Sequence, residues 1–215
     1  MRHLLLAAAL AVALPALAQE DISKVNSSIR IEAGKAAGDL GTVNGGIRLG
    51  DGASAREVET VNGGIRLARG AKVETAETVN GGIELEETAI VERSVEAVNG
   101  GIELAPGAEA GGDVSNVNGS ISVRGARVGG RIETVNGSVT ITDGAKVLGG
   151  LKVEKPSGWS WGKSRPPRIV IGPDSEVAGE LVFEREVELY VHASAKVGPI
   201  SGATPVRYDG ANPPN

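Results

Sequence analysis

One repeated stretch decides the fold, and a representative copy reads Val61-Asn62-Gly63-Gly64-Ile65-Arg66-Leu67-Ala68-Arg69-Gly70-Ala71-Lys72-Val73. Close variants of its first five residues begin at Val25, Val43, Val61, Val79, Val98, Val117 and Val135. The steps between these valines are 18, 18, 18, 19, 19 and 18 residues. A nearly constant step of this length is typical of a repeat architecture in which each unit packs on the next.

The repeat divides again into thirds, because Val61, Leu67, Val73 and Val79 lie six residues apart. Within a unit the apolar residues come in pairs two apart, such as Ile65 and Leu67. Period two is the signature of a β-strand. Three short strands per unit, each with an inward pair and a bend after it, predict an all-β, single-stranded parallel β-helix. Its triangular coils take about 18 residues, and the aliphatic residues of the six-residue lattice are expected to fill the interior.

Two other folds fit the pattern less well. A helix would need apolar residues at the i, i+3, i+4, i+7 spacing and would be broken by the glycine pairs. A β-sandwich would need longer strands and has no reason for a constant step. The two 19-residue steps each require one extra residue, which a corner or strand edge accommodates.

Composition supports a narrow aliphatic core and argues against an enzyme. Hydrophobic residues make up 40% of the chain but aromatic residues only 2%, whereas enzyme folds of this size usually use aromatic side chains in cores and pockets. The chain has no Cys and two His, which excludes disulfides and thiolate chemistry and leaves little for imidazole chemistry. We therefore expect no enzymatic activity, no cofactor and no metal site.

An asparagine follows the first valine of every unit and should mark one corner of the coil. Asn and the glycine after it tolerate left-handed backbone angles, and stacked amides can form hydrogen bonds from turn to turn. We interpret this row as a structural ladder rather than as a site for sugar or ice. It consists of Asn26, Asn44, Asn62, Asn80, Asn99, Asn118 and Asn136.

Two rows of polar residues are expected on the outside of the coils. The position between the inward pair gives Arg30, Arg48, Arg66, Glu84, Glu103, Ser122 and Thr140. A second row has Glu59, Glu77, Glu96 and Glu133, with Thr42, Thr60, Thr78 and Thr134 beside it. Stacked carboxylates attract Ca²⁺, but the Asp- and Gly-rich calcium loops of known binding repeats are absent. We interpret both rows as solvated faces that discourage association of sheets.

The N-terminus predicts export. Residues 1–18 combine Arg2, an apolar run and the Ala16-Leu17-Ala18 cleavage pattern of a secretory signal peptide, and they are too short for a transmembrane helix. Cleavage would leave 21 basic and 27 acidic residues, a net charge of −6. An acidic chain disfavours nucleic acid and anionic membranes as partners. We expect a periplasmic or extracellular protein with no transmembrane segment in its mature chain.

The solenoid domain is expected to span residues 19–201, roughly ten coils, with an inserted loop at 155–168 that holds both tryptophans. Aromatic faces beside cationic side chains suit sugar rings, an acidic polymer or a partner protein, although the rings could instead shield the solenoid flank. The candidate binding residues of this loop are Trp159, Trp161, Lys163, Arg165 and Arg168. Residues 202–215 contain Pro205, Pro213 and Pro214 and predict a flexible tail or a cap on the last coil.

Catalytic patterns find little support in the sequence. A β-helix polysaccharide lyase or glycosidase needs acidic residues clustered in a groove or pocket, whereas the aspartates here are scattered at bends. Hexapeptide acyltransferases also use 18-residue coils, but their catalytic histidine would have to be His192, which we interpret as a surface strand residue.

The Val-Asn-Gly-Ser/Gly-Ile units after a signal peptide resemble the bacterial adhesin family of the β-strand-repeat type, over about residues 22–200. This resemblance implies a right-handed parallel β-helix. The segment from Ile169 to Val197 also looks like the polymer-forming bactofilins, which are cytosolic, unlike an exported chain.

Three functions therefore stay open. The first is a non-enzymatic exported cell-envelope protein for adhesion or scaffolding, which would bind an envelope polymer or a surface protein. The second is a polymer that self-associates end to end through its exposed terminal coils. The third is an envelope polysaccharide enzyme.

Overall fold

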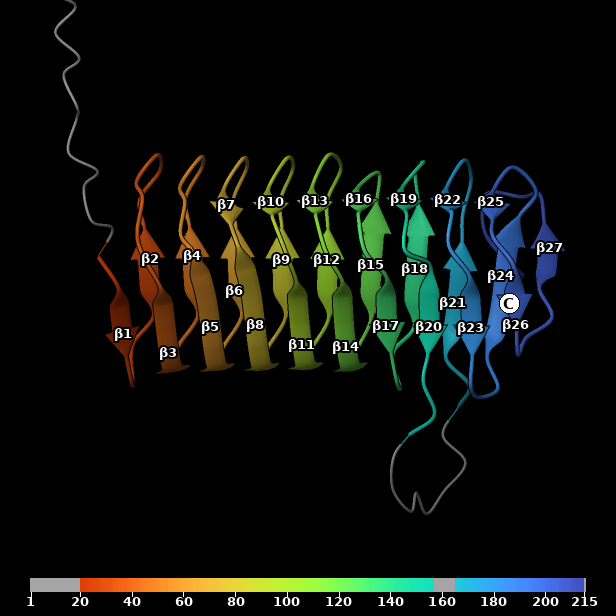
Figure 1. The fold of residues 1–215 in the computed structure, drawn as a ribbon, viewed down its shortest axis with the longest axis horizontal. Helices are drawn as coiled ribbons and strands as arrows, with labels where there is room; N and C mark the ends of the chain where they lie inside the picture. The colour runs from red at the N-terminus through yellow and green to blue at the C-terminus, as the bar shows by residue number, and fades with distance from the viewer. Residues whose placement is uncertain (1–19, 157–164, 215) are drawn as a thin grey trace, which may run out of the picture.

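The computed structural model describes residues 20–156 and 165–214 of the 215-residue chain. Within these ranges the chain forms strands and no helix, and neighbouring strands pair in parallel. About nine turns of roughly 19 residues stack from β1 (Ile22–Lys24) at one end to β27 (Val206–Tyr208) at the other (Figure 1). The predicted all-β parallel solenoid is confirmed. The predicted signal peptide, residues 1–18, lies outside the described residues.

Each turn contributes strands to three sheets, called A, B and C here. Sheet A contains β1, β3 (Leu40–Asn44), β5 (Glu57–Asn62), β8 (Thr75–Asn80), β11 (Val95–Asn99), β14 (Val114–Asn118), β17 (Ile132–Thr134), β20 (Leu151–Val153), β23 (Leu181–Phe183) and β26 (Ile200–Ser201). Sheet B contains β2 (Ile29–Ile31), β4 (Ile47–Leu49), β6 (Ile65–Leu67), β9 (Ile83–Leu85), β12 (Ile102–Leu104), β15 (Ile121–Arg124), β18 (Val139–Thr142), β21 (Arg168–Ile171), β24 (Glu188–His192) and β27. Sheet C contains β7 (Lys72–Val73), β10 (Ile90–Val91), β13 (Glu109–Ala110), β16 (Arg127–Val128), β19 (Lys146–Val147), β22 (Glu176–Val177) and β25 (Lys196–Val197).

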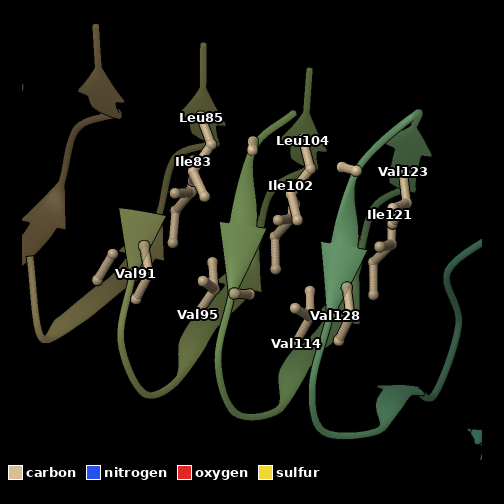
Figure 2. Packing of buried hydrophobic residues seen from close by; sticks show 14 of the residues in the cluster. Ile83, Leu85, Val91, Val95, Ile102, Leu104, Val114, Ile121, Val123 and Val128 are labelled. Atoms are coloured by element: carbon tan, nitrogen blue, oxygen red, sulfur yellow. The ribbon is translucent and has the colours of Figure 1, made fainter. Parts of the chain in front are cut away.

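The interior is filled by aliphatic side chains that stack in register from turn to turn. Within one turn, Ile83 and Leu85 of sheet B, Val91 of sheet C and Val95 of sheet A point into the same space (Figure 2). All four are buried. Fully burying such a side chain stabilises the fold by about 1.5–3 kcal/mol. The narrow space between three sheets explains why branched aliphatics and alanine replace aromatic residues.

The asparagine corner is a continuous run of hydrogen-bonded amides. Each Nδ2 donates to the Oδ1 of the asparagine one turn earlier, at 2.8–3.0 Å, from Asn44 onto Asn26 through to Asn136 onto Asn118. The next turn offers no further asparagine. Instead Arg185 reaches back and donates from Nη1 to Oδ1 of Asn136 at 2.8 Å. An arginine thus closes the C-terminal end of the ladder.

The left-handed backbone angles expected at this corner are not found. None of the seven asparagines has a positive φ, and among the six glycines that follow them only Gly119 does, at 129°. The glycines are needed because successive corners approach closely. A Cβ built on Gly81 would lie 1.9 Å from the carbonyl oxygen of Gly63. Close packing of backbone on backbone, rather than an unusual angle, therefore selects glycine here.

The 19-residue steps are accommodated at a corner, as predicted. Val73 pairs with Val91, and Ala76 pairs with Val95, so the longer turn has one extra residue between β10 and β11. The strands on either side keep their register because the corner absorbs the insertion.

The inserted loop ends earlier than the predicted residue 168. Strand β21 begins at Arg168, and the carbonyl of Pro167 accepts a hydrogen bond from the backbone N–H of Glu188 at 2.9 Å. Arg168 therefore belongs to sheet B rather than to the loop. Trp159, Trp161 and Lys163 lie outside the described residues.

The predicted solenoid boundary at residue 201 is also too early. Strand β27 pairs in parallel with β24, and its Tyr208 is buried with its ring 5.0 Å from that of His192, edge to face. A strand of the last turn therefore replaces part of the expected tail. It was hidden in the sequence because Val206 and Tyr208 form one short alternation between proline-containing segments.

Candidate functional site

A row of exposed valines runs along sheet A, where the six-residue lattice predicts buried side chains. Val61, Val79 and Val98 are 40%, 40% and 41% exposed. The complete valine row is Val25, Val43, Val61, Val79, Val98 and Val117. The prediction that the first valine of each unit points into the solenoid is therefore wrong. Sequence reasoning missed this row because a valine in a strand normally indicates a buried position.

Threonines take the inward positions instead, although the sequence places them on a solvated face. Thr60 and Thr78 are each 4% exposed. The Oγ1 of Thr60 donates to the carbonyl of Gly45 at 2.8 Å, and that of Thr78 donates to the carbonyl of Gly63 at 2.9 Å. The hydroxyls thereby satisfy corner carbonyls inside the solenoid, where an unpaired polar group is costly. This requirement turns the next valine outward in the strands that carry a threonine here, whereas Ala97 and Asn116 take the same buried position in β11 and β14.

A row of carboxylates lies beside the valines on the same face. Glu59 pairs in register with Glu77, and Glu77 with Glu96, on consecutive turns. Among the residues that the structure describes, none of these three side chains forms an ion pair. Burial raises the pKa of the Glu77 carboxyl, and the carboxylates of Glu96 and Glu59 raise that pKa further, against a smaller opposing effect of Arg93. The glutamate row, Glu59, Glu77 and Glu96, is thus a strip of negative charge without an ion pair among the described residues.

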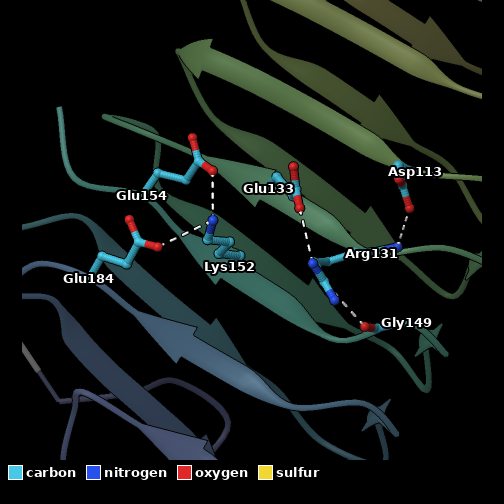
Figure 3. A network of polar contacts seen from close by, with 7 residues as sticks. All are labelled: Asp113, Arg131, Glu133, Gly149, Lys152, Glu154 and Glu184. Carbon is cyan, nitrogen blue, oxygen red and sulfur yellow. Dashed lines mark hydrogen bonds and ion pairs between the residues drawn. The ribbon is translucent and has the colours of Figure 1, made fainter. Parts of the chain in front are cut away.

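The charge is balanced only toward the C-terminal end of this face (Figure 3). Lys152 Nζ lies 2.8 Å from Glu154 Oε1 and 3.2 Å from Glu184 Oε1. Arg131 Nη1 lies 3.3 Å from Glu133 Oε1. The free negative charge on sheet A is therefore concentrated on β5, β8 and β11.

The valine and glutamate rows line one elongated depression of about 620 Å³, which we call the sheet A groove. It runs along the solenoid from Ser23 of β1 to Glu154, just after β20. The groove offers apolar contact and negative charge side by side over many turns. Such a surface suits a partner with both basic and apolar groups.

Comparison of the chain with protein-family models, curated proteins and solved structures finds no match. The resemblances to adhesins and bactofilins therefore stay predictions. Among the described residues no helix is long and apolar enough to span a membrane. In the same residues no three His, Cys, Asp or Glu side chains come together as ligands for a metal ion.

Sheet B presents a second face with the opposite charge at its N-terminal end. Arg30, Arg48 and Arg66 stand in register on consecutive strands, β2, β4 and β6. We call them the arginine row. Arg66 forms ion pairs with Glu84 at 2.6 Å and with Glu86 at 2.5 Å. In the described part of the chain, Arg30 and Arg48 form no ion pair, so their charges stay uncompensated.

A groove of about 750 Å³ lies beside the arginine row. Its floor includes Gly46, Gly64 and Gly82, which carry no side chains. Farther along the same face, Arg124 pairs with Glu103. The change from arginine to glutamate along this face was predicted from the sequence. It follows from the in-register pairing of the sheet B strands, which places these residues in one row.

The structure places only two of the five residues predicted in the tryptophan loop. Arg165 is exposed. The guanidinium of Arg168 lies 4.6 Å from the centre of the Tyr190 ring, and its Nη2 donates to the carbonyl of Pro214 at 2.8 Å. Arg168 therefore stabilises the packing of the C-terminal segment against sheet B, and its guanidinium is already engaged within the chain.

Proposed function

We propose that this chain is a non-enzymatic, exported protein of the cell envelope that acts as a scaffold or adhesin-like binding protein. One observation carries the proposal: the valine row and the uncompensated glutamate row follow each other along one continuous face. Soluble chains rarely expose long apolar stretches unless a partner covers them.

The solenoid supports such a role mechanically. Strands that pair with the turns before and after them hold the rows at a repeat of about 4.8 Å, so the outward side chains are fixed relative to one another. A partner then meets a preformed surface and orders few protein side chains on binding. Nothing in this role requires a pocket or a catalytic group.

A second candidate is end-to-end polymerisation, supported by the ends of the sheets. Strands β1 and β2 each pair on one side only, and so do β26 and β27 at the opposite end. Unpaired strand edges favour pairing with another chain. Sedimentation over a concentration series tests this candidate, because a rod that elongates end to end must grow with concentration even when its lateral faces are altered.

Replacing the centre of the valine row should weaken envelope binding. In a V61T/V79T/V98T variant the apolar contact is lost while strand-forming residues are kept, so we expect at least about tenfold weaker binding to isolated envelope fractions. The measurement is cosedimentation of the purified chain with those fractions. A K146T/E176T/K196T variant on sheet C serves as the matched control and should bind normally.

Two further arms make this test decisive. A W159A/W161A variant asks whether the tryptophan loop is the contact; loss of binding in this variant alone would contradict the role of sheet A. Fractionation of the producing cells tests export, and a chain retained in the cytoplasm with residues 1–18 attached would contradict an envelope function.

A further inference from the structure

Among the described residues, two faces of this chain carry opposite charges, and all of these charged residues except Arg66, which is bound to Glu84 and Glu86, lack an ion pair within the chain. The arginine row and the glutamate row each place three like charges on consecutive turns, about 4.8 Å apart, an arrangement that is destabilising without counter-charges. Arg30 and Arg48 form no ion pair among the described residues, and neither do the three glutamates. Each row therefore lacks what the other supplies.

The spacing of the rows selects the kind of partner. An extended peptide repeats its side chains on one side every 6.6 Å or so, twice the rise per residue, and falls out of step with a 4.8 Å row within about three turns. A second solenoid has the same repeat by construction. A second copy of this chain can therefore place one charge opposite each charge along the whole row.

The shapes of the two faces also correspond. The sheet A groove is lined by valines beside glutamates, and the sheet B groove is lined by glycines beside arginines. Arginine side chains can lay their aliphatic stems on the valines while the guanidinium groups meet the carboxylates. The glutamates then fit over Gly46, Gly64 and Gly82.

We propose that copies of this chain associate side by side, with the arginine row of one copy seated in the sheet A groove of the next. The proposal deepens the scaffold function above and rests on it. The second copy lies antiparallel, with the two unpaired arginines, Arg30 and Arg48, opposite Glu96 and Glu77. Arg66, which is bound to Glu84 and Glu86 of its own chain, then lies opposite Glu59. In a parallel arrangement with the two rows matched, Glu103 would meet Glu133, whereas the antiparallel arrangement brings Glu84 to Gly41 and Glu103 to Ser23.

The contact joins two different faces, so it is heterologous. Each bound copy keeps one free arginine row or one free glutamate row for a further copy, and such contacts generate open arrays unless their rotation closes a ring. A lateral array of rods would build a layer or bundle, which is a form suited to an envelope scaffold.

Charge reversal tests the pairing directly. Sedimentation of the exported full chain should show self-association that weakens steeply from low to high salt. The R30E/R48E variant and the E77R/E96R variant should each associate roughly tenfold more weakly or worse, because like charges then face each other. An equimolar mixture of the two variants should restore association, since both the native and the reversed pairs become complementary.

Several results would overturn the proposal. These are a wild-type chain that stays monomeric at every concentration, reversed variants that associate as well as wild type, or a mixture that shows no recovery. An R127E/K146E variant, with the same charge change on sheet C, is the control and should associate normally. If a reversed variant does not fold, the R30Q/R48Q and E77Q/E96Q variants replace it, and each must still lose the salt dependence.

The outcomes separate this proposal from the envelope function. A monomeric chain that binds envelope fractions overturns the lateral pairing and leaves the proposed function standing. A chain that self-associates but is neither exported nor bound to envelope fractions overturns the proposed function and leaves the pairing standing.

Discussion

Replacing Gly100 with alanine is expected to lower the free energy of unfolding by about 3 kcal/mol or more, the largest effect of any single methyl group at this corner. A Cβ on Gly100 would lie 1.8 Å from the carbonyl oxygen of Gly81 and 2.4 Å from its carbonyl carbon. Both atoms belong to backbone that is held between neighbouring turns, so no flexible side chain can move aside. Urea unfolding followed by circular dichroism measures the loss.

The next residue supplies a matched control. A Cβ on Gly101 would lie 3.2 Å from its nearest neighbour, the carbonyl oxygen of Ser120. Three other units already carry serine at this position, Ser28, Ser120 and Ser138. The G101S variant should therefore stay within about 0.5 kcal/mol of wild type. In the first turn, the position equivalent to Gly100 is occupied by Ser27. A side chain fits there because no earlier turn lies beneath it. A G100A variant as stable as G101S would contradict the close stacking of the corners.

The second large effect is expected from Thr78→Val, which should cost about 1–3 kcal/mol. The two side chains have nearly the same shape, but valine cannot donate to the Gly63 carbonyl, which then loses its hydrogen bond inside the solenoid. The neighbouring V79T variant makes the reverse exchange on the outer face and should change stability by less than about 0.5 kcal/mol. Urea midpoints of the two variants and wild type provide the comparison.

The order of the two effects is the informative result. If V79T destabilises the chain more than T78V does, valine rather than threonine faces the interior, and the sheet A groove does not exist as described. Equal and small effects would show that the Gly63 carbonyl finds another partner.

The repeat predicted the architecture because its strongest signals are local. Asn80 and Gly81 mark a corner wherever they occur, and the pair Ile83 and Leu85 shows period two within a single short strand. Stacking such units follows from a constant step. The fold and the register of the outward arginine row could be predicted from these local signals. The extra residue of the longer turns could be predicted only to lie at a corner or a strand edge.

Which side of each sheet A strand faces the interior could not be predicted from local signals. Val61 and Leu67 are six residues apart and look equivalent, but the corner between them resets which side of the strand faces inward. The burial of Val58 and the hydrogen bond between Thr60 and the Gly45 carbonyl decide the phase, and that hydrogen bond joins two different turns. The signal that would have found it is the threonine that precedes the valine in four of the seven units, at Thr42, Thr60, Thr78 and Thr134, whose reason lies in three dimensions.

The candidate site could also be predicted only in part from the sequence. The glutamate row was predicted as a solvated face, and its side chains are indeed outward, but the apolar row beside it was not foreseen. Arg168 was expected in a binding loop because tryptophans and basic residues cluster near it in sequence. In the structure the guanidinium of Arg168 instead lies over the ring of Tyr190, a residue one turn farther along sheet B.

Cysteine labelling tests the central claim, that Val79 and the other residues of the valine row face solvent while the preceding residue, here Thr78, faces the core. The chain has no cysteine of its own, so V79C and T78C variants each carry a single reporter thiol. A thiol reagent added to the native proteins should modify the V79C variant rapidly and the T78C variant only when urea unfolds the chain. Fast modification of T78C together with protection of V79C would contradict the account.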